Sequence, residues 1–317
     1  MKIRFFVLIT GMLSAIWSHA AAPCNSEVSA PRIVPIWNNA SAPHDNGLRG
    51  DETEFGLRFI GNVTEAVLYI YPAAPDKATG QAAVICPGGG YEYLSDRETL
   101  PVAMRFASHG INAFILRYSI NSPFPAALLE LAYAVKYVRE NAEKYDIDPD
   151  KILLCGFSAG GHLTASLGTL WNSEYLHSII GSTEMFKPNG MILCYPVITS
   201  GKYRHKGSIE SILGKNPSEK MLELVSLEKQ VSGKTPKTFI WHCSDDQTVP
   251  VENTINFTKA LSQYKVPFEC HIFPYGGHGL ALADESTAKH EGHINTECAQ
   301  WTKLAVEWIK REFMTEK

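Results

Sequence analysis

The 317-residue sequence has few cysteines, no large excess of charge of either sign, and no apolar run long enough to anchor it in a membrane. Its seven cysteines are too sparse, and odd in number, for a disulfide scaffold. The 29 basic residues and 33 acidic residues give a formal net charge of −4, so the chain lacks the strongly basic character of nucleic-acid-binding domains. We therefore expect no nucleic-acid partner and no membrane span, which takes ~20 apolar residues.

What the chain does contain is typical of a globular protein. Hydrophobic residues make up 45% of the sequence and charged residues 20%, which excludes a disordered chain, a collagen-like repeat and a coiled coil. The length suits one large domain or two small ones. One domain is the simpler account, because no internal repeat or low-complexity segment is visible.

The N-terminus has the pattern of a secretory signal peptide. Lys2 and Arg4 precede an apolar run over residues 5–16, and small residues follow, including the cleavage signal Ser18-His19-Ala20. We predict a signal peptide over residues 1–20 and a secreted or periplasmic protein. Its alternative, a buried N-terminal helix, is less favoured by this order of residues.

A proline- and asparagine-rich lead segment is expected over residues 21–50, followed by one domain over residues 51–317. In that domain, apolar runs alternate with helical patterns, which indicates crossover connections and a mostly parallel sheet. Residues 201–234 are polar and interrupt this alternation of strand and helix patterns. They form either an insertion over the active site or an ordinary crossover with long loops. The predicted strands are residues 66–71, 82–86, 113–118, 152–155, 191–195, 238–242 and 269–273.

Most of the cysteines fall in or beside these predicted strands, where a thiol behaves as a small hydrophobic side chain. Cys24 and Cys298 remain a candidate disulfide pair. The spacing His290-Glu291-Gly292-His293 lacks a third ligand at a defined distance, and no zinc motif occurs, so no metal site is expected. The cysteines predicted to be buried are Cys86, Cys155, Cys194, Cys243 and Cys270.

The strongest local signal is Gly156-Phe157-Ser158-Ala159-Gly160. It follows a predicted strand and precedes a helical pattern, which is the strand–turn–helix setting that Gly-x-Ser-x-Gly requires. The flanking glycines relieve the crowding of a sharp turn, and the serine stands at a helix N-terminus that favours negative charge. We predict that Ser158 is a nucleophile.

A serine hydroxyl needs a base and an acid that orients the base. His278 lies among glycines after the last predicted strand, which is typical of a loop that presents an imidazole. Asp245 and Asp246 follow the preceding strand, and from the residues alone either one is a candidate for the acid.

An acyl-transfer site also needs backbone donors for the oxyanion. One candidate is the amide of Ala159, and the second is the amide of Gly89 or Gly90 in the segment Cys86-Pro87-Gly88-Gly89-Gly90-Tyr91. A phosphate loop is the alternative for this segment, but neither Gly-Lys-Ser/Thr nor GxGxxG occurs there. Tyr91 and Tyr93 follow directly and are candidates to bind substrate by stacking on a sugar, with plain packing as the other possibility.

These motifs, in this order along the chain, resemble the esterase/lipase branch of the α/β-hydrolase superfamily, and more narrowly the secreted bacterial carbohydrate esterases of the acetyl-xylan esterase type. The resemblance extends from about Ile33 to the C-terminus. It implies an α/β-hydrolase fold with a mostly parallel central sheet and helices on both faces. It also implies that Asp246 is the acid, since the acid of such families lies four residues after a histidine that closes the strand, here His242.

The resemblance implies a secreted serine esterase that needs no cofactor and hydrolyses short acyl esters, acetyl above all, on a plant polysaccharide such as xylan. The partner expected for it is an acetylated carbohydrate or another ester. The alternatives are a general carboxylesterase or lipase for short acyl chains and, from a different class, a non-catalytic binding protein on the same fold.

Overall fold

The computed structural model describes residues 32–37, 46–56 and 58–313. The predicted signal peptide, Cys24 and most of the predicted lead segment lie outside the described residues. Within the described ranges, no helix is both long and apolar enough to cross a membrane.

The described strands form one eight-stranded sheet and one small three-stranded sheet. The large sheet has the order β1-β4-β7-β5-β8-β9-β10-β11, in which β1 and β4 pair antiparallel and the six strands from β7 to β11 are parallel. The small sheet, β2-β3-β6, is antiparallel. The strands are β1 (Arg32–Pro35), β2 (Thr53–Phe55), β3 (Phe59–Gly61), β4 (Val67–Tyr71), β5 (Ala82–Cys86), β6 (Leu94–Ser95), β7 (Asn112–Arg117), β8 (Ile152–Phe157), β9 (Gly190–Cys194), β10 (Lys237–Cys243) and β11 (Phe268–Phe273).

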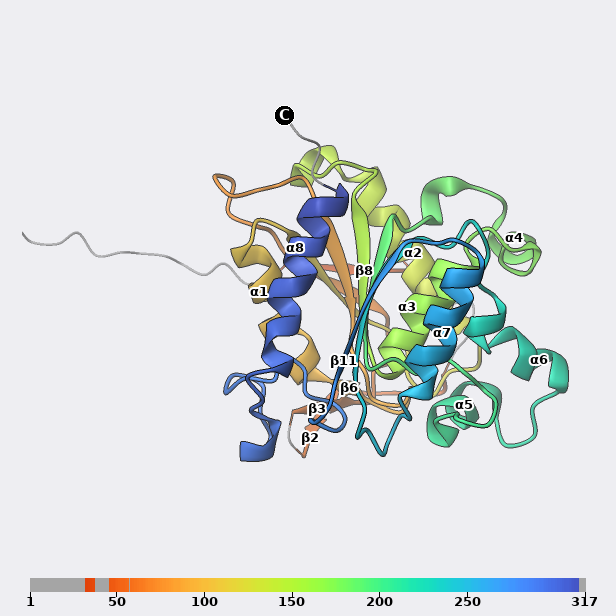
Figure 1. Ribbon diagram of the computed structural model, residues 1–317. Helices are drawn as coiled ribbons and strands as arrows, with labels where there is room; N and C mark the ends of the chain where they lie inside the picture. Colours follow the sequence, from red (N-terminus) through yellow and green to blue (C-terminus); the bar gives the residue numbers. More distant parts are fainter. Residues whose placement is uncertain (1–31, 38–45, 57, 314–317) are drawn as a thin grey trace, which may run out of the picture. The chain divides into compact units, whose positions relative to one another are not determined.

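Helices cover both faces of the large sheet. Helices α1 and α8 pack on one face, and α2, α3 and α7 on the other (Figure 1). Each presents an apolar stripe to the sheet, as the helical spacing in the sequence indicates. The helices are α1 (Leu100–Ser108), α2 (Ala126–Glu140), α3 (Ala159–Leu170), α4 (Glu174–Ile180), α5 (Lys206–Leu213), α6 (Glu219–Leu224), α7 (Glu252–Gln263) and α8 (Trp301–Phe313).

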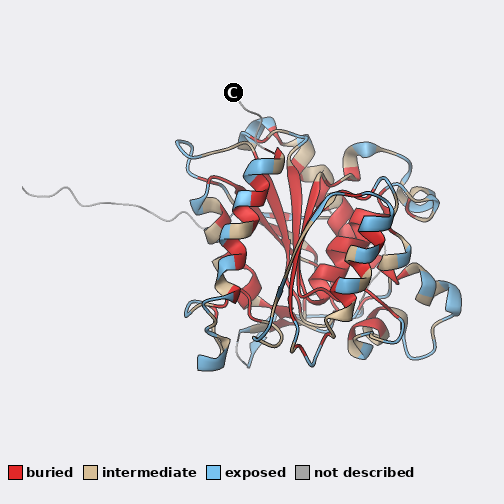
Figure 2. Ribbon diagram, in the orientation of Figure 1, coloured by how far each residue is buried: buried red, intermediate tan, exposed pale blue. Residues whose placement is uncertain are grey.

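The middle strands are buried on both faces. Every residue of β5, β8 and β9 is buried, whereas the edge strand β11 is partly exposed (Figure 2). This explains why the middle strands read as continuous apolar runs rather than as alternating ones. It also corrects one prediction: Cys270 is only half-buried, because it lies on the edge strand, whereas Cys86, Cys155, Cys194 and Cys243 are buried as expected.

The seven predicted strands are confirmed, each to within two residues at either end. The fold class predicted from the sequence is confirmed as well. Because β5, β8, β10 and β11 are parallel, the loops that follow them emerge at the same edge of the sheet. Those four loops carry the residues that the sequence motifs single out.

Candidate active site

Ser158 stands at the sharp turn between β8 and α3. Its backbone has φ +53° and ψ −118°, a strained conformation for a residue with a side chain. A Cβ atom on Gly156 would come 2.2 Å from the carbonyl oxygen of Gly160, and one on Gly160 would come 2.1 Å from that of Cys86. Both positions therefore exclude larger residues, and the turn depends on the two glycines of the motif.

The serine, the histidine and one aspartate form a continuous chain of hydrogen bonds. Ser158 Oγ lies 2.8 Å from His278 Nε2, and His278 Nδ1 lies 2.6 Å from Asp246 Oδ2. The carboxylate can only accept, so Nδ1 carries the hydrogen and Nε2 is left as the acceptor of the serine hydroxyl. The arrangement has the connectivity of a nucleophile, a base and an orienting acid.

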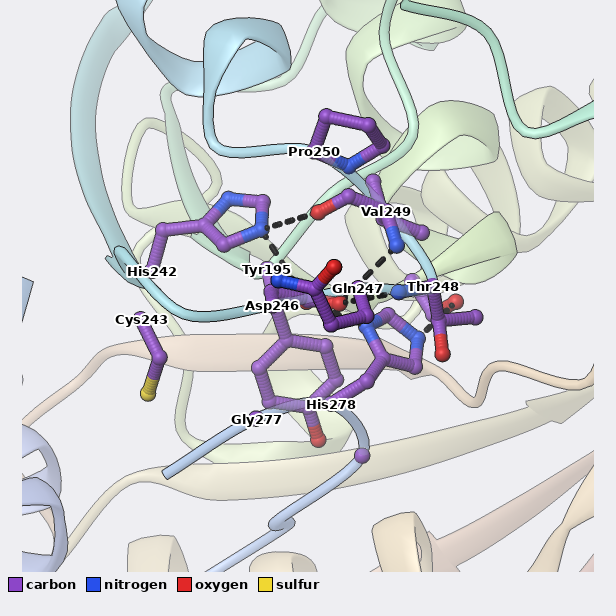
Figure 3. A network of polar contacts seen from close by, with 12 residues as sticks. Tyr195, His242, Cys243, Asp246, Gln247, Thr248, Val249, Pro250, Gly277 and His278 are labelled. Carbon is purple, nitrogen blue, oxygen red and sulfur yellow. Dashed lines mark hydrogen bonds and ion pairs between the residues drawn. The ribbon is translucent and has the colours of Figure 1, made fainter. Parts of the chain in front are cut away.

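Asp246 is buried and surrounded by donors (Figure 3). Its Oδ1 accepts the amides of Thr248 and Val249, both at 2.9 Å, and its Oδ2 also lies 3.2 Å from His242 Nε2. Burial alone raises the pKa of Asp246, but the hydrogen bonds from His242 and His278 outweigh it, so the pKa lies well below the ordinary value. The carboxylate therefore stays ionised beside the imidazole.

The neighbouring Asp245 makes a different set of contacts. Its two carboxylate oxygens accept the amides of Gly276, at 3.2 Å, and Gly277, at 2.9 Å. Asp245 thus ties down the backbone of the loop that carries His278, while Asp246 contacts the imidazole itself. This agrees with the resemblance to the esterase family, which implies that Asp246 and not Asp245 is the acid.

The glycine loop after β5 lies opposite the serine. Gly89 and Gly90 line the same cavity as Ser158 and His278, and Ala159 is the first residue of α3. Gly89 has φ +130°, and a Cβ there would come 2.0 Å from the carbonyl oxygen of Tyr93. Only glycine therefore fits at this position of the loop.

Two residues that the motifs do not include fix this loop. Glu98, in the 3-10 turn Asp96–Glu98, is buried and accepts the Gly88 amide at 2.7 Å. The hydroxyl of Tyr195 donates to the other oxygen of Glu98 at 2.8 Å and accepts the Ala281 amide at 2.9 Å. Burial, and then the charge of Glu98, raise the pKa of Tyr195 well above its ordinary value, so it remains a donor.

The Glu98–Tyr195 pair links the glycine loop to the segment that follows His278. The Tyr195 ring also lies edge-on to the His278 ring, with the centroids 5.0 Å apart. No sequence motif indicates this pair, because the two residues are 97 positions apart. The one sequence feature that points to Glu98 is its position, as an acidic residue in the short segment between the glycine loop and the next helix.

The two tyrosines expected to bind substrate have different surroundings. Tyr93 lines the cavity, and its ring lies 4.6 Å from the ring of Phe59. Tyr91 is buried instead, with its hydroxyl 2.9 Å from Nδ1 of the buried His162, and it does not line this cavity. In an extended strand, residues two apart such as Tyr91 and Tyr93 point to the same side. Tyr91 has a left-handed backbone, with φ +64°, so this rule does not apply and the two side chains point differently.

The cavity has a volume of about 370 Å³, and most of the residues that line it carry polar side chains. The segment 201–234 contributes His205 and Gly207 to it. His205 caps α5, with its Nδ1 accepting the Ser208 amide at 3.2 Å, and burial lowers its pKa. The wall also includes Phe59, Glu92, Tyr93, Ser95, Arg97, Glu98, Thr248, Gly279 and Lys289.

The remaining candidate groups of the sequence lie elsewhere. Cys298, the proposed partner of Cys24, is a buried free thiol whose Sγ lies 3.6 Å from Cys243 Sγ. His290 and His293 lie with their rings 4.2 Å apart. In the part of the chain that the structure describes, no group of three or more His, Cys, Asp or Glu residues is arranged to hold a metal ion.

Comparison with known proteins identifies the family of this chain. The BD-FAE family model matches residues 68–261. Endo-1,4-beta-xylanase B of Butyrivibrio fibrisolvens is 37% identical over 277 residues, which are 82% of this chain and 43% of that protein. The acetylxylan esterase of Xylanibacter ruminicola (strain ATCC 19189 / DSM 19721 / CIP 105475 / JCM 8958 / 23) is 29% identical over 72% of this chain and 46% of that protein. The chain thus spans less than half the length of either relative.

Solved structures agree with this placement. The acetyl ester-xyloside bifunctional hydrolase of Caldicellulosiruptor lactoaceticus is 34% identical, with a TM-score of 0.76 over 92% of this chain and all of that chain. MGS-M1, an alpha/beta hydrolase enzyme from a Medee basin deep-sea metagenome library, is 27% identical, with a TM-score of 0.61 over 83% of this chain and 97% of that chain. With the family model matching more than half of its residues, the chain belongs to the BD-FAE family of α/β-hydrolases.

Proposed function

We propose that the protein is a serine esterase that works through Ser158, His278 and Asp246. His278 Nε2 takes the proton of the Ser158 hydroxyl as Oγ attacks the ester carbonyl, and Asp246 holds the imidazole in the required tautomer. The protonated His278 then gives the proton to the departing alcohol oxygen. Water, activated in turn by His278, cleaves the acyl-serine and releases the acid.

The oxyanion of each tetrahedral intermediate needs preorganised donors. We assign this role to the amides of Ala159 and of Gly89 or Gly90. The position of Ala159 at the start of α3 adds the positive end of the helix dipole. The Gly88 amide is excluded from this role, because it already donates to Glu98.

For the substrate we propose short acyl esters, acetyl above all, on a polysaccharide such as xylan. The names of the acetylxylan esterase and the acetyl ester-xyloside hydrolase that resemble this chain support it. So do the polar side chains among the residues that line the cavity, which can form hydrogen bonds with a sugar. The second candidate is a general carboxylesterase, favoured by similarity to the carboxylesterase Cest-2923 of Lactobacillus plantarum WCFS1, at 25% identity and a TM-score of 0.69.

We also propose that the protein is exported, on the basis of the signal-peptide pattern at residues 1–20. N-terminal sequencing of the protein recovered from the medium or periplasm of a bacterial host tests this. A mature chain that begins near Ala21 would support export, and an intact Met1 in the cytoplasm would contradict it.

The observation that carries the proposed activity is the 2.8 Å contact between Ser158 Oγ and His278 Nε2, with Asp246 on the far side of the ring. We expect Ser158→Ala to lower kcat on p-nitrophenyl acetate by at least ~10³-fold, which is the size of triad effects. Ser178→Ala, which changes an exposed serine on α4, is the matched control.

The same assay distinguishes the candidate substrates. An acetyl-specific carbohydrate esterase should prefer acetyl over butyryl and longer p-nitrophenyl esters and should release acetate from acetylated xylan. Equal rates along the acyl series, without acetate release from the polymer, would favour the general carboxylesterase. Full activity of a carefully purified Ser158→Ala variant would refute the triad, and inactivity of the native protein on every ester would favour a binding protein.

A further inference from the structure

Two basic side chains lie in the wall of the cavity that contains Ser158 and His278. They are Arg97, which is 2% exposed, and Lys289, which is half-buried. Arg97 belongs to the turn after the glycine loop, and Lys289 to the long segment between β11 and α8. The fold thus brings two positive charges from distant parts of the chain to the site where the ester would bind.

Neither of these side chains has a carboxylate partner among the ion pairs of the described residues. The guanidinium of Arg97 donates instead to the backbone carbonyls of Thr287 and Gly279, each at 2.6 Å. Its Nε is buried and has no hydrogen-bond partner within the described part of the chain. The Lys289 ammonium lies 4.2 Å from the centre of the Phe59 ring.

The acidic residues of the cavity wall are already engaged. Glu98 accepts the Gly88 amide and the Tyr195 hydroxyl, one on each oxygen. Glu92 accepts a hydrogen bond from Ser211 at 3.2 Å. Glu98 attracts Lys289 but forms no ion pair with it or with Arg97 among the described contacts. Cations held in a partly desolvated site without an ion-pair partner are costly, so this site is suited to a ligand that brings a negative charge.

The local electrostatics agree with this interpretation. Burial lowers the pKa of Lys289, and repulsion from Arg97 lowers it further by more than the attraction of Glu98 raises it. The pKa of His293 is also lowered, to about 4, by burial and then by the charges of Arg97, His290 and Lys289. This corner of the site is therefore electropositive, and His293 stays neutral in it.

We propose that Arg97 and Lys289 form a subsite for a carboxylate carried by the ester substrate. Arg97 holds a fixed position through its two carbonyl contacts, and Lys289 supplies a compact charge on a flexible side chain. The rings of Phe59 and Tyr93 beside it provide an apolar surface on which a sugar ring can stack. This proposal rests on the proposed esterase function and names the charge of its substrate.

The carboxylate has two possible sources, and the experiment separates them. One is a uronic acid branch on the glycan, and the other is the free carboxylate of a dicarboxylic acyl group. The first pair of substrates is an acetylated xylooligosaccharide with and without a glucuronic acid branch. The second pair is p-nitrophenyl hemisuccinate and p-nitrophenyl acetate. The native enzyme should prefer the charged member of at least one pair.

The decisive quantity is the ratio of kcat/KM for the charged member of a pair to that for the neutral member. Lys289→Met keeps the aliphatic stem and removes the charge, and we expect it to lower this ratio about tenfold, the size of one lost charge-assisted contact. Lys289→Arg should retain most of the preference. Lys303→Met, which changes an exposed lysine on α8, is the matched control and should leave the ratio unchanged.

Several outcomes would overturn the proposal. One is a native enzyme with no preference for the charged member of either pair. Another is a Lys289→Met variant in which the ratio of kcat/KM between the two members is unchanged. The last is a variant in which kcat/KM falls equally on both members. A purely structural role for Lys289 would produce the last of these. A preference that does not weaken with added salt would also contradict it, because a partly exposed charge pair is screened.

A binding measurement separates this proposal from the esterase assignment. Calorimetry with Ser158→Ala and the glucuronic acid-branched xylooligosaccharide, or with p-nitrophenyl hemisuccinate, reports on the subsite without hydrolysis. Binding that is lost in the Ser158→Ala/Lys289→Met variant supports the carboxylate subsite even if the native protein hydrolyses no ester. No binding of either charged compound refutes the subsite, whatever the activity on p-nitrophenyl acetate.

Discussion

Two buried carboxylates contact different parts of the candidate site: Asp246, after β10, contacts His278, and Glu98 contacts the glycine loop. They are 4% and 2% exposed, and each accepts backbone amides together with side-chain donors. Their donors differ in kind: Asp246 contacts an imidazole that would exchange protons, whereas Glu98 contacts a loop amide and a tyrosine. Burial therefore does not distinguish a catalytic carboxylate from a positioning one. The groups that each carboxylate contacts do distinguish them.

The largest effect that this comparison predicts is at Asp246. In Asp246→Asn, the amide nitrogen can face His278 Nδ1 and favour the wrong tautomer, so kcat on p-nitrophenyl acetate should fall by ~10³- to 10⁴-fold. Steady-state kinetics together with a thermal melt test this. A folded variant that retains more than a tenth of native activity would mean that Asp246 is not the orienting acid.

A smaller effect is expected at Glu98, which acts through the glycine loop. Glu98→Gln keeps the shape but weakens the hold on the Gly88 amide, so we expect kcat to fall by about 10- to 100-fold with little change in KM. This is less than the loss of an oxyanion donor itself, about 10²- to 10³-fold. A rise in KM with unchanged kcat would contradict a role in positioning the oxyanion loop.

Tyr195→Phe completes this test. If Glu98 and Tyr195 act as a unit, the double variant should cost much less than the product of the two single losses. Independent, multiplying losses would show that the two side chains stabilise their loops separately.

Asp245 provides the closest comparison, because it precedes Asp246 in the chain. Asp245→Asn can keep one of the two contacts to the amides of Gly276 and Gly277, so we expect only a severalfold fall in kcat. The thermal midpoint should fall slightly, since one charge-assisted hydrogen bond weakens. A loss as large as that of Asp246→Asn would exchange the roles assigned to the two aspartates.

A third buried carboxylate, Glu130 on α2, should affect stability and not activity. It accepts hydrogen bonds from the amide and hydroxyl of Ser119, and burial raises its pKa from 4.5 to about 7 although these bonds lower it. Between those two pH values the folded chain binds more protons than the unfolded chain, so the free energy of unfolding falls as pH rises through this window.

Across this pH window the free energy of unfolding should fall by about 3 kcal/mol, since one pKa unit corresponds to about 1.4 kcal/mol. Thermal melts at pH 4.5 and pH 8 should show that Glu130→Gln has a flatter pH dependence than the native protein. The same slope in both proteins would mean that Glu130 titrates at its ordinary pKa.

The sequence predicts the middle of the sheet well and its periphery poorly. The strands β5, β8 and β9 are buried on both faces, so only apolar residues fit and the pattern is unambiguous. The short strands β2 and β3 and the edge strand β1 are largely exposed or only three or four residues long, and no comparable pattern marks them.

The same difference applies to the site. Ser158, His278 and the two aspartates were found because each follows a predicted strand in a loop of distinctive composition. The Glu98–Tyr195 pair and the charges of Arg97 and Lys289 were not, because their meaning depends on contacts between residues about 100 to 190 positions apart. For the same reason the sequence left both stacking and plain packing open for Tyr91: its burial depends on His162, which the local sequence does not indicate.

Capture of the acyl-enzyme is the most direct test of Ser158 as the nucleophile. The protein would be mixed with p-nitrophenyl acetate, quenched in acid within the first turnovers and mapped by peptide mass spectrometry. We expect one acetyl group on Ser158, accumulating in the native protein and absent from Ser158→Ala. Turnover with the acetyl group on another residue would contradict it, as would hydrolysis by Ser158→Ala at the native rate.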